Sequence, residues 1–356
     1  MVIDQVDLFA GQMPTRTRFS YGSAAKFNFV IMRVHAAEQS GTGETLHVID
    51  DSLEMLAKSL VRKDAAKLDD LLAHFQSGVA GHRELASMAL HDLVGRVRNV
   101  PLHRVLRLRV NDPVTVMPCL FPDDPSHAKQ LAESFVNEGF TALKTKLYGN
   151  LDGDVALTTA VRSALPDGFV QGDLNCAYRD RKMATNAMAK LSDAGMSALE
   201  DPLEGSFDDY LWLLEQADRP KLILDAPSRG SEALKEICRL RCCDAVNLHP
   251  VQQGTFSELL QRAQIIREAG LGVQVGGTGF TGVGSWAYAQ LARIAGGDLP
   301  FGELGGVRDH GMPAATSSGT IPVTNGDLDL PTLPGHGGQL NLDVLNRFVQ
   351  QRKSYC

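Results

Sequence analysis

Eight short apolar segments recur between residues 113 and 304, and stretches with helical periodicity separate each segment from the next. The expected strands are Val114–Leu120, Ala142–Leu147, Val170–Leu174, Ala198–Pro202, Lys221–Ala226, Ala245–His249, Gly272–Gly276 and Pro300–Leu304. Asp124–Glu138 and Phe256–Ala269 are two of the helices expected between them. Strands that alternate with helices pair in parallel, because each helix carries the chain back to the same edge of the sheet. Eight such units in a row favour a closed (β/α) barrel over an open doubly wound sheet.

Charged side chains interrupt four consecutive strands of this pattern. Lys144 and Lys146 are two residues apart on the second strand, so both point to one face. Asp173, Glu200 and Asp225 lie at the ends of the third, fourth and fifth strands, where a barrel of this type carries its functional groups. One such acid alone is more simply a strand-end cap or an ion-pair partner. Three acids beside a lysine pair predict an all-oxygen site that suits Mg²⁺.

A divalent ion at this site would hold the carboxylate of a small substrate. It would lower the pKa of the adjacent C–H group by stabilising the enediolate that forms when the proton leaves. We expect a lowered pKa for Lys146, because the ion and Lys144 both place positive charge beside it. A neutral Lys146 is then available as a general base.

These residues resemble the motifs of the enolase superfamily, and within it the mandelate racemase and muconate lactonizing enzyme branch. Lys144-Thr-Lys146 is similar to the K-x-K motif of that family, and the three acids are similar to its metal ligands. The other matching segments are Ala86–Gly95 in the cap domain, Gly276–Thr278, Gly302–Leu304 and Leu333–Gly335.

The resemblance implies a modified (β/α)7β TIM-type barrel with an α+β capping domain. It also implies Mg²⁺ as the cofactor, with Mn²⁺ as a substitute, and Lys146 as the base on one face of the substrate. Lys144 would help to bind the substrate carboxylate and tune Lys146. We expect a cap over residues 1–112, a barrel over 113–320 and a segment over 321–356 that returns to the cap.

On the sixth strand the resemblance fails at one position. The lactonizing branch has a second lysine there, and this chain has His249. The racemase branch pairs a sixth-strand aspartate with a seventh-strand histidine, and Gly272–Gly276 contains no histidine. Neutral imidazole can still exchange a proton near neutral pH. His249 is therefore either a second catalytic acid/base or only a substrate-binding residue, with Lys146 doing one-base chemistry.

Residues just beyond the strand ends are candidates for substrate contact. They are Asn175, Gly277, Thr278 and Glu303. Glu303 has the alternative of being a solvated loop acid. The glycines at 277, 279 and 282 match a dinucleotide-binding pattern, but they follow the seventh strand rather than open an initial βαβ unit. Room for substrate at the barrel mouth explains them better.

The regions that flank the barrel are predicted to form the cap. Phe29–His35 predicts a strand and Gly41–Thr45 a turn, whereas Gly11–Gly22 is either a mobile flap or an ordinary loop. Residues 51–110 are helical by pattern. In the tail, we expect a short helix over Leu342–Gln350 that folds back onto the N-terminal region.

Composition excludes several classes of partner. The net charge of −7 and the absence of a basic run argue against nucleic acid. No apolar run reaches the ~18 residues that a membrane span needs. The six cysteines lack a framework spacing, so free thiols in a reducing cytoplasm are expected.

We therefore expect a cytoplasmic, homo-oligomeric, Mg²⁺-dependent isomerase: a racemase, epimerase or cycloisomerase. The first alternative is a lyase, either an acid-sugar dehydratase or an enzyme of the o-succinylbenzoate synthase type. A non-catalytic binding protein on the same fold and a metal-free NAD oxidoreductase are more distant alternatives.

Overall fold

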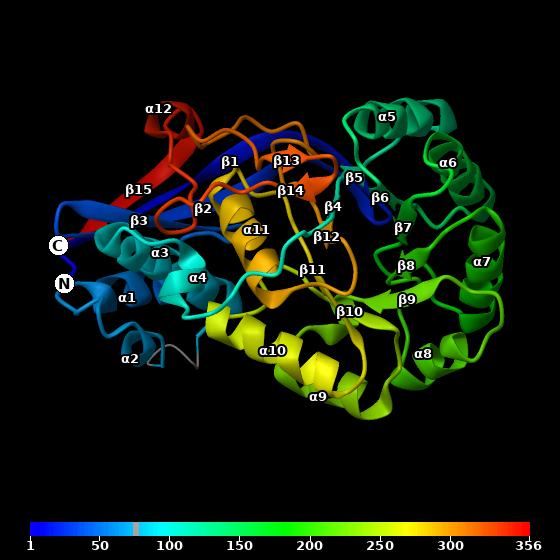
Figure 1. Ribbon diagram of the computed structural model, residues 1–356, viewed down its shortest axis with the longest axis horizontal. Coiled ribbons are helices and arrows are strands. Elements are labelled where there is room, and N and C mark those ends of the chain that lie inside the picture. The colour runs from blue at the N-terminus through cyan, green and yellow to red at the C-terminus, as the bar shows by residue number, and fades with distance from the viewer. Residues whose placement is uncertain (74–77) are drawn as a thin grey trace.

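The computed structural model describes residues 1–73 and 78–356, and its larger part is the predicted barrel (Figure 1). Seven strands form a parallel sheet in the order β11-β10-β9-β8-β7-β6-β5, and β12 pairs in parallel with β4. The barrel strands are β4 Val116–Met117, β5 Cys119–Leu120, β6 Ala142–Lys146, β7 Phe169–Asp173, β8 Ala198–Glu200, β9 Lys221–Leu224, β10 Ala245–Leu248, β11 Gly272–Val275 and β12 Phe301–Gly302. All eight predicted segments form strands. The first is split into β4 and β5 at Pro118, which has no N–H group to donate.

The expected helices follow the strands and cover the outside of the barrel (Figure 1). They are α5 Pro125–Asn137, α6 Leu151–Ala164, α7 Arg181–Asp193, α8 Phe207–Leu214, α9 Ser231–Leu240, α10 Phe256–Glu268 and α11 Val283–Ala295. Side-chain caps begin several of them. Asp124 accepts the backbone N–H of His127 at the start of α5, and Thr255 with Glu258 forms a capping box on α10.

The cap combines an antiparallel sheet with helices. The sheet has the order β15-β1-β2-β3, with β1 Gln5–Phe19, β2 Gly22–Ala36, β3 Gln39–Thr45 and β15 Val349–Tyr355. The helices are α1 Asp51–Leu60, α2 Leu68–Ala73, α3 Ala80–Arg98 and α4 Leu102–Val105. Residues 74–77 of the predicted helical region lie outside the described residues.

The predicted turn at Gly41–Thr45 is wrong, because these residues belong to β3. Their glycines serve close packing instead. A Cβ atom on Gly41 would lie 2.2 Å from the carbonyl oxygen of Ala89, and one on Gly43 would lie 2.3 Å from that of Leu85. Helix α3 can therefore approach β3 only where side chains are missing.

Gly11–Gly22 is not an ordinary loop. It continues β1 as far as Phe19, and a short turn leads into β2. The resulting hairpin runs from the cap to the mouth of the barrel (Figure 1). Its tip contacts the barrel through the hydroxyl of Ser20, which donates to the carbonyl oxygen of Asn175 at 3.5 Å.

The tail returns to the cap as a strand. The helix predicted over Leu342–Gln350 is correct only for α12 Leu342–Leu345, and the chain is extended from Val349. β15 pairs antiparallel with β1, with Val6 opposite Tyr355. Earlier in the tail, β13 Val323–Thr324 and β14 Asp327–Leu328 form a small hairpin beside β4.

The six cysteines are all free, as the sequence predicted. None of the helices in the described ranges is long and apolar enough to cross a membrane.

Candidate active site

The predicted lysine pair lies inside the barrel, at the C-terminal end of β6. Lys144 and Lys146 are only 4% and 5% exposed. The Nζ atom of Lys144 is 3.1 Å from Asp173 Oδ2 and 2.9 Å from Glu200 Oε2. The Nζ atom of Lys146 donates to the same Asp173 oxygen at 2.5 Å. Parallel register produces this cluster, because it places Lys146 beside Asp173 and Asp173 beside Glu200 on adjacent strands.

Asp225 follows β9 and is also buried, and its carboxylate pairs with an arginine. Its Oδ2 atom is 3.1 Å from the guanidinium of Arg229. The carboxylate of Asp201 accepts the backbone N–H groups of Asp225 and Ala226 at 2.9 and 2.8 Å, which orients this strand end.

The charges around Glu200 fit a divalent cation. Burial and the neighbouring carboxylates of Asp173 and Asp225 raise the pKa of Glu200, although Lys144 opposes them. Three buried carboxylates on adjacent strands thus carry an excess of negative charge and offer only oxygen ligands, which is the donor set that Mg²⁺ prefers. Within residues 1–73 and 78–356, no three acidic, histidine or cysteine side chains are already gathered around one point, and the Lys144 ammonium lies between Asp173 and Glu200.

The predicted lowering of the Lys146 pKa included the charge of a bound divalent ion, whereas the protein's own side chains shift this pKa in the opposite direction. Burial disfavours the ammonium form, but the carboxylate of Asp173 outweighs it, so the pKa of Lys146 is raised. The pKa of Lys144 is raised in the same way by Asp173, Glu200 and Glu303. Conversely, the two ammonium groups overcome burial and lower the pKa of Asp173 to about 2. The prediction considered the positive neighbours of Lys146 and missed the closer negative one.

Glu303 lies in the same cluster, at the end of β12. It is buried, and its Oε1 atom is 3.6 Å from Lys144 Nζ and 4.0 Å from Lys146 Nζ. Its Oε2 atom is 3.4 Å from Nε2 of His310, whose other ring nitrogen is 2.9 Å from the hydroxyl of Thr17. His310 was assigned no role from the sequence. Its only sequence signal is a position seven residues after Glu303 in a loop.

Side chains from other strands orient Glu200. Gln171 on β7 donates to its Oε2 atom at 2.6 Å, and Asn247 on β10 donates to its Oε1 atom at 3.0 Å. Gln171 in turn exchanges hydrogen bonds with Gln274 on β11. These polar residues of the barrel interior were not predicted from the sequence.

Aromatic rings cover Lys146. The ring of Phe19, at the tip of the cap hairpin, lies 5.3 Å from its Nζ atom, and that of Phe121 lies 5.9 Å away. Phe121 also packs against His310 in a tilted arrangement, with ring centroids 4.6 Å apart. Both rings limit the access of water to the lysine.

His249 lies directly after β10. In the sheet order, β10 is four strands from β6, so in a closed eight-stranded barrel the two stand on opposite sides. Its Nδ1 atom is 2.8 Å from the carbonyl oxygen of Pro250. A carbonyl oxygen only accepts, so Nδ1 carries the proton and Nε2 of the neutral ring is free to accept one.

The remaining candidates form the rim of the site. Asn175 has a φ of +45°, and its backbone N–H donates to Asp173 Oδ1 at 2.9 Å. Gly277 must be a glycine, because a Cβ atom there would lie 2.3 Å from the backbone nitrogen of Glu303. Thr278 is buried beside it.

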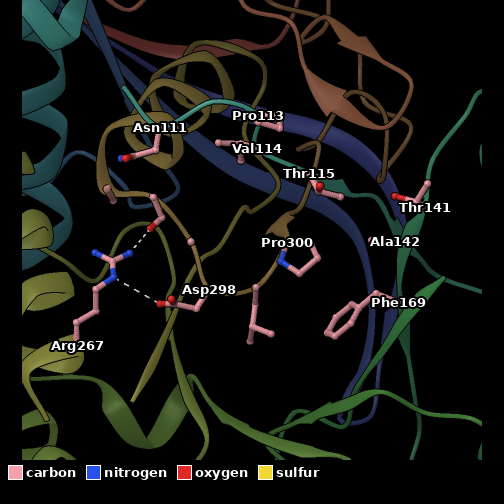
Figure 2. A pocket seen from close by; sticks show the side chains of 14 residues that line it. Asn111, Pro113, Val114, Thr115, Thr141, Ala142, Phe169, Arg267, Asp298 and Pro300 are labelled. Carbon is pink, nitrogen blue, oxygen red and sulfur yellow. Dashed lines mark hydrogen bonds and ion pairs between the residues drawn. The ribbon is translucent and has the colours of Figure 1, made fainter. Parts of the chain in front are cut away.

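A separate cavity of about 590 Å³ opens at the other end of the barrel, where the strands begin (Figure 2). Its lining includes Val114, Ala142, Phe169 and Pro300, with the Arg267 guanidinium held against Asp298. It contains none of the predicted site residues.

Known proteins resemble the chain over most of its length. The family model described as enolase C-terminal domain-like matches residues 127–344. An N-succinyl-L-Arg/Lys racemase of Bacillus cereus is 23% identical, over 98% of this chain and 98% of that protein. An o-succinylbenzoate synthase of Bacillus subtilis is 24% identical, over 86% and 81%.

Solved structures share the fold. The crystal structure of a dipeptide epimerase from Cytophaga hutchinsonii, complexed with Mg and the dipeptide D-Ala-L-Val, has a TM-score of 0.86 and 20% identity, and the match covers 100% of both chains. This similarity confirms the predicted barrel with its capping domain.

Proposed function

The chain belongs to the enolase C-terminal domain-like family, and we propose that it removes a proton from the carbon α to a substrate carboxylate and returns one to isomerise the substrate. The observation that carries this proposal is the buried lysine pair, packed against carboxylates on successive barrel strands. Racemisation and epimerisation begin with this step, and a cycloisomerisation includes it in its ring-opening direction. The substrate is a small carboxylate.

Asp173, Glu200 and Asp225 would hold Mg²⁺ or Mn²⁺, since their charges and oxygen ligands fit a divalent ion. When bound, the ion supplies positive charge that stabilises the substrate carboxylate as the α-proton leaves. Gln171 and Asn247 hold Glu200 in one orientation. Asp201 does the same for the backbone that carries Asp225.

Lys146 is the proposed base on one face of the substrate. It must be neutral to accept the proton, so its ion pair with Asp173 has to weaken before the reaction. The C–H bond then breaks, its proton passes to Nζ of Lys146, and its electron pair is delocalised into the carboxylate. Lys144 keeps its proton and binds that carboxylate, while Phe19 and Phe121 exclude water.

His249 is the proposed partner on the opposite face. Its protonated ring donates from Nε2 to the α-carbon, which forms the new C–H bond with inverted configuration. In the reverse direction the neutral ring accepts the α-proton at Nε2, and Lys146 returns one. The tautomer fixed by Pro250 leaves Nε2 available for both steps.

Lyase activity is the second candidate, because one similar protein is an o-succinylbenzoate synthase. Elimination begins with the same loss of an α-proton to Lys146. It differs in the next step, where a leaving group departs and His249 protonates it.

Proton exchange tests the proposal directly. The protein with Mg²⁺ in D₂O is incubated with N-acyl amino acids, dipeptides, sugar acids and muconate-like acids, and the α-proton is followed by NMR. We expect exchange with one of these classes, its loss in Lys146→Ala for the configuration whose α-proton faces Lys146, and no change in the exposed-lysine control Lys190→Ala.

The products separate the two candidates. Inversion without loss of a group supports the isomerase, whereas an unsaturated product supports the lyase. Exchange of that configuration that survives in Lys146→Ala would contradict the assigned base. Mg²⁺ binding by calorimetry without exchange of any acid would instead support a non-catalytic binding protein.

A further inference from the structure

Glu84 is a buried carboxylate of the cap whose hydrogen bonds all go to the barrel. It lies on α3 and is 1% exposed. Its Oε1 atom accepts the backbone N–H of Val251 at 2.7 Å, and its Oε2 atom accepts that of Gln253 at 3.2 Å. The hydroxyl of Tyr288 on α11 donates to Oε1 at 2.8 Å. A cap residue thus binds the turn that follows β10.

The same turn carries His249. The side-chain amide of Gln253 donates to the carbonyl oxygen of His249 at 2.8 Å, and the imidazole Nδ1 donates to that of Pro250. Val251 has a φ of +70°, a strained conformation that a β-branched residue rarely adopts. A strained turn keeps its shape only when its surroundings impose it, and here Glu84 accepts the N–H group of the strained residue.

Neighbouring residues of α3 contact the start of α10, which follows this turn. The hydroxyl of Ser87 accepts the backbone N–H of Phe256 at 3.0 Å, and Arg83 forms an ion pair with Glu258 at 2.6 Å. Among these three contacts, that of Glu84 is nearest in sequence to His249.

Lys146 is supported in a different way. It is the last residue of β6, and its position follows from the pairing of β6 with β7. The two sides of the site are therefore built by different parts of the molecule: the barrel sheet places Lys146, and the cap helix α3 bonds to the turn of His249.

We propose that Glu84 is a positioning residue for His249, which sets the imidazole for proton transfer on the face opposite Lys146. The proposal rests on the two-sided reaction described above. It adds that the cap determines one of the two proton transfers through this carboxylate.

Glu84→Gln tests the proposal, since the amide keeps the shape but cannot accept from both backbone N–H groups and Tyr288 together. The substrate is the acid that the proton-exchange screen identifies. Its two configurations at the α-carbon are supplied separately, and the exchange of the α-proton in D₂O is measured for each. We expect the rate of exchange through His249 and the rate of inversion to fall about 10- to 100-fold, because a misplacement of order 1 Å lowers a rate by about this factor. Exchange through Lys146 should stay within about twofold of the wild type.

Glu44→Gln is the matched control. Glu44 is another buried cap carboxylate that accepts backbone N–H groups of the barrel, those of Thr281 and Gly284, but it does not touch the turn of His249. Glu44→Gln should change the rate of exchange through His249 and the rate of exchange through Lys146 by the same factor. An equal decrease in both directions for Glu84→Gln would show that Glu84 only attaches the cap, and would overturn the proposal.

A second readout needs neither substrate nor metal. Long-range ¹H–¹⁵N spectra of histidine-labelled protein, assigned with His249→Asn, report which ring nitrogen carries the proton. We expect the Nδ1–H form in the wild type and a mixture of tautomers in Glu84→Gln. An unchanged His249 signal in a folded variant would also overturn the proposal.

Tyr288→Phe provides a milder variant if Glu84→Gln does not fold, because it removes one donor and keeps the carboxylate. It should show the same asymmetry to a smaller extent, and a symmetric loss would count against the proposal. If His249→Asn leaves the exchange of both configurations unchanged, the two-sided reaction itself fails. The ring spectra of wild type and Glu84→Gln then still decide whether Glu84 positions His249.

Discussion

Replacing Glu44 with glutamine should change how the stability of the protein depends on pH. Glu44 is completely buried in β3, and its carboxylate accepts backbone N–H groups from Thr281 and Gly284 at 2.5 and 2.8 Å. Burial, only partly offset by these hydrogen bonds, raises its pKa from an ordinary 4.5 to about 7. The folded protein therefore holds a proton on Glu44 at pH values where the unfolded chain has released it.

The sign and the size follow from this difference. Between pH 4.5 and about 7 the folded state binds more protons, so the contribution of Glu44 to stability falls as pH rises and is constant above that window. At about 1.4 kcal/mol per pKa unit, the loss between pH 5 and 8 is roughly 2–3 kcal/mol. Glu44→Gln removes this loss because the amide does not titrate.

Urea unfolding of wild type and Glu44→Gln at pH 5, 6, 7 and 8 measures the effect. Other buried groups also contribute to the pH dependence of stability. Burial lowers the pKa of His91 to about 4, so the contribution of His91 to stability rises with pH. Such contributions are common to both proteins, so they cancel in the difference between the two free energies of unfolding. We expect the variant to gain about 2–3 kcal/mol on the wild type between pH 5 and 8, and the exposed control Glu133→Gln to gain nothing. A difference that stays constant with pH would refute the reasoning.

Three further predictions concern the site. Asp201→Asn should weaken Mg²⁺ binding about 10- to 100-fold by calorimetry, because an amide cannot accept both N–H groups of Asp225 and Ala226; unchanged affinity would contradict this. His310→Asn should lower kcat about tenfold at unchanged Mg²⁺ affinity, since Glu303 loses the partner that orients it; weakened metal binding would point to a different role. Removal of divalent ions with EDTA should stop α-proton exchange, and Mg²⁺ or Mn²⁺ should restore it; exchange that persists without them would exclude a metal-dependent reaction.

The barrel was predictable because its signals are local. A buried parallel strand needs only a short apolar run, and every predicted segment contains one. The cap was harder to predict. Along residues 15–19, buried and more exposed side chains alternate as they do in a strand. The buried positions are mainly threonines, however, and their hydrogen-bond partners lie in a loop nearly 300 residues later.

The lysine pair and strand-end acids were visible in the sequence for the same local reason. Register alone brings Lys146, Asp173 and Glu200 together. His310 meets the cluster only through the closure of the barrel, and Phe19 only because the cap hairpin reaches the barrel mouth, and no local pattern encodes either contact. The raised pKa of Lys146 also depends on a distance to Asp173 that spacing does not supply.

The pairing of β15 with β1 has a consequence for the order in which the molecule assembles. β1 is synthesised before the barrel sequence and its partner β15 after it. Until β15 has left the ribosome, one edge of β1 has unpaired backbone groups, which makes it a site for wrong pairing with other chains. We therefore expect the nascent chain to hold a formed barrel beside an incomplete cap, and the hairpin that covers Lys146 to become firmly seated only when β15 arrives.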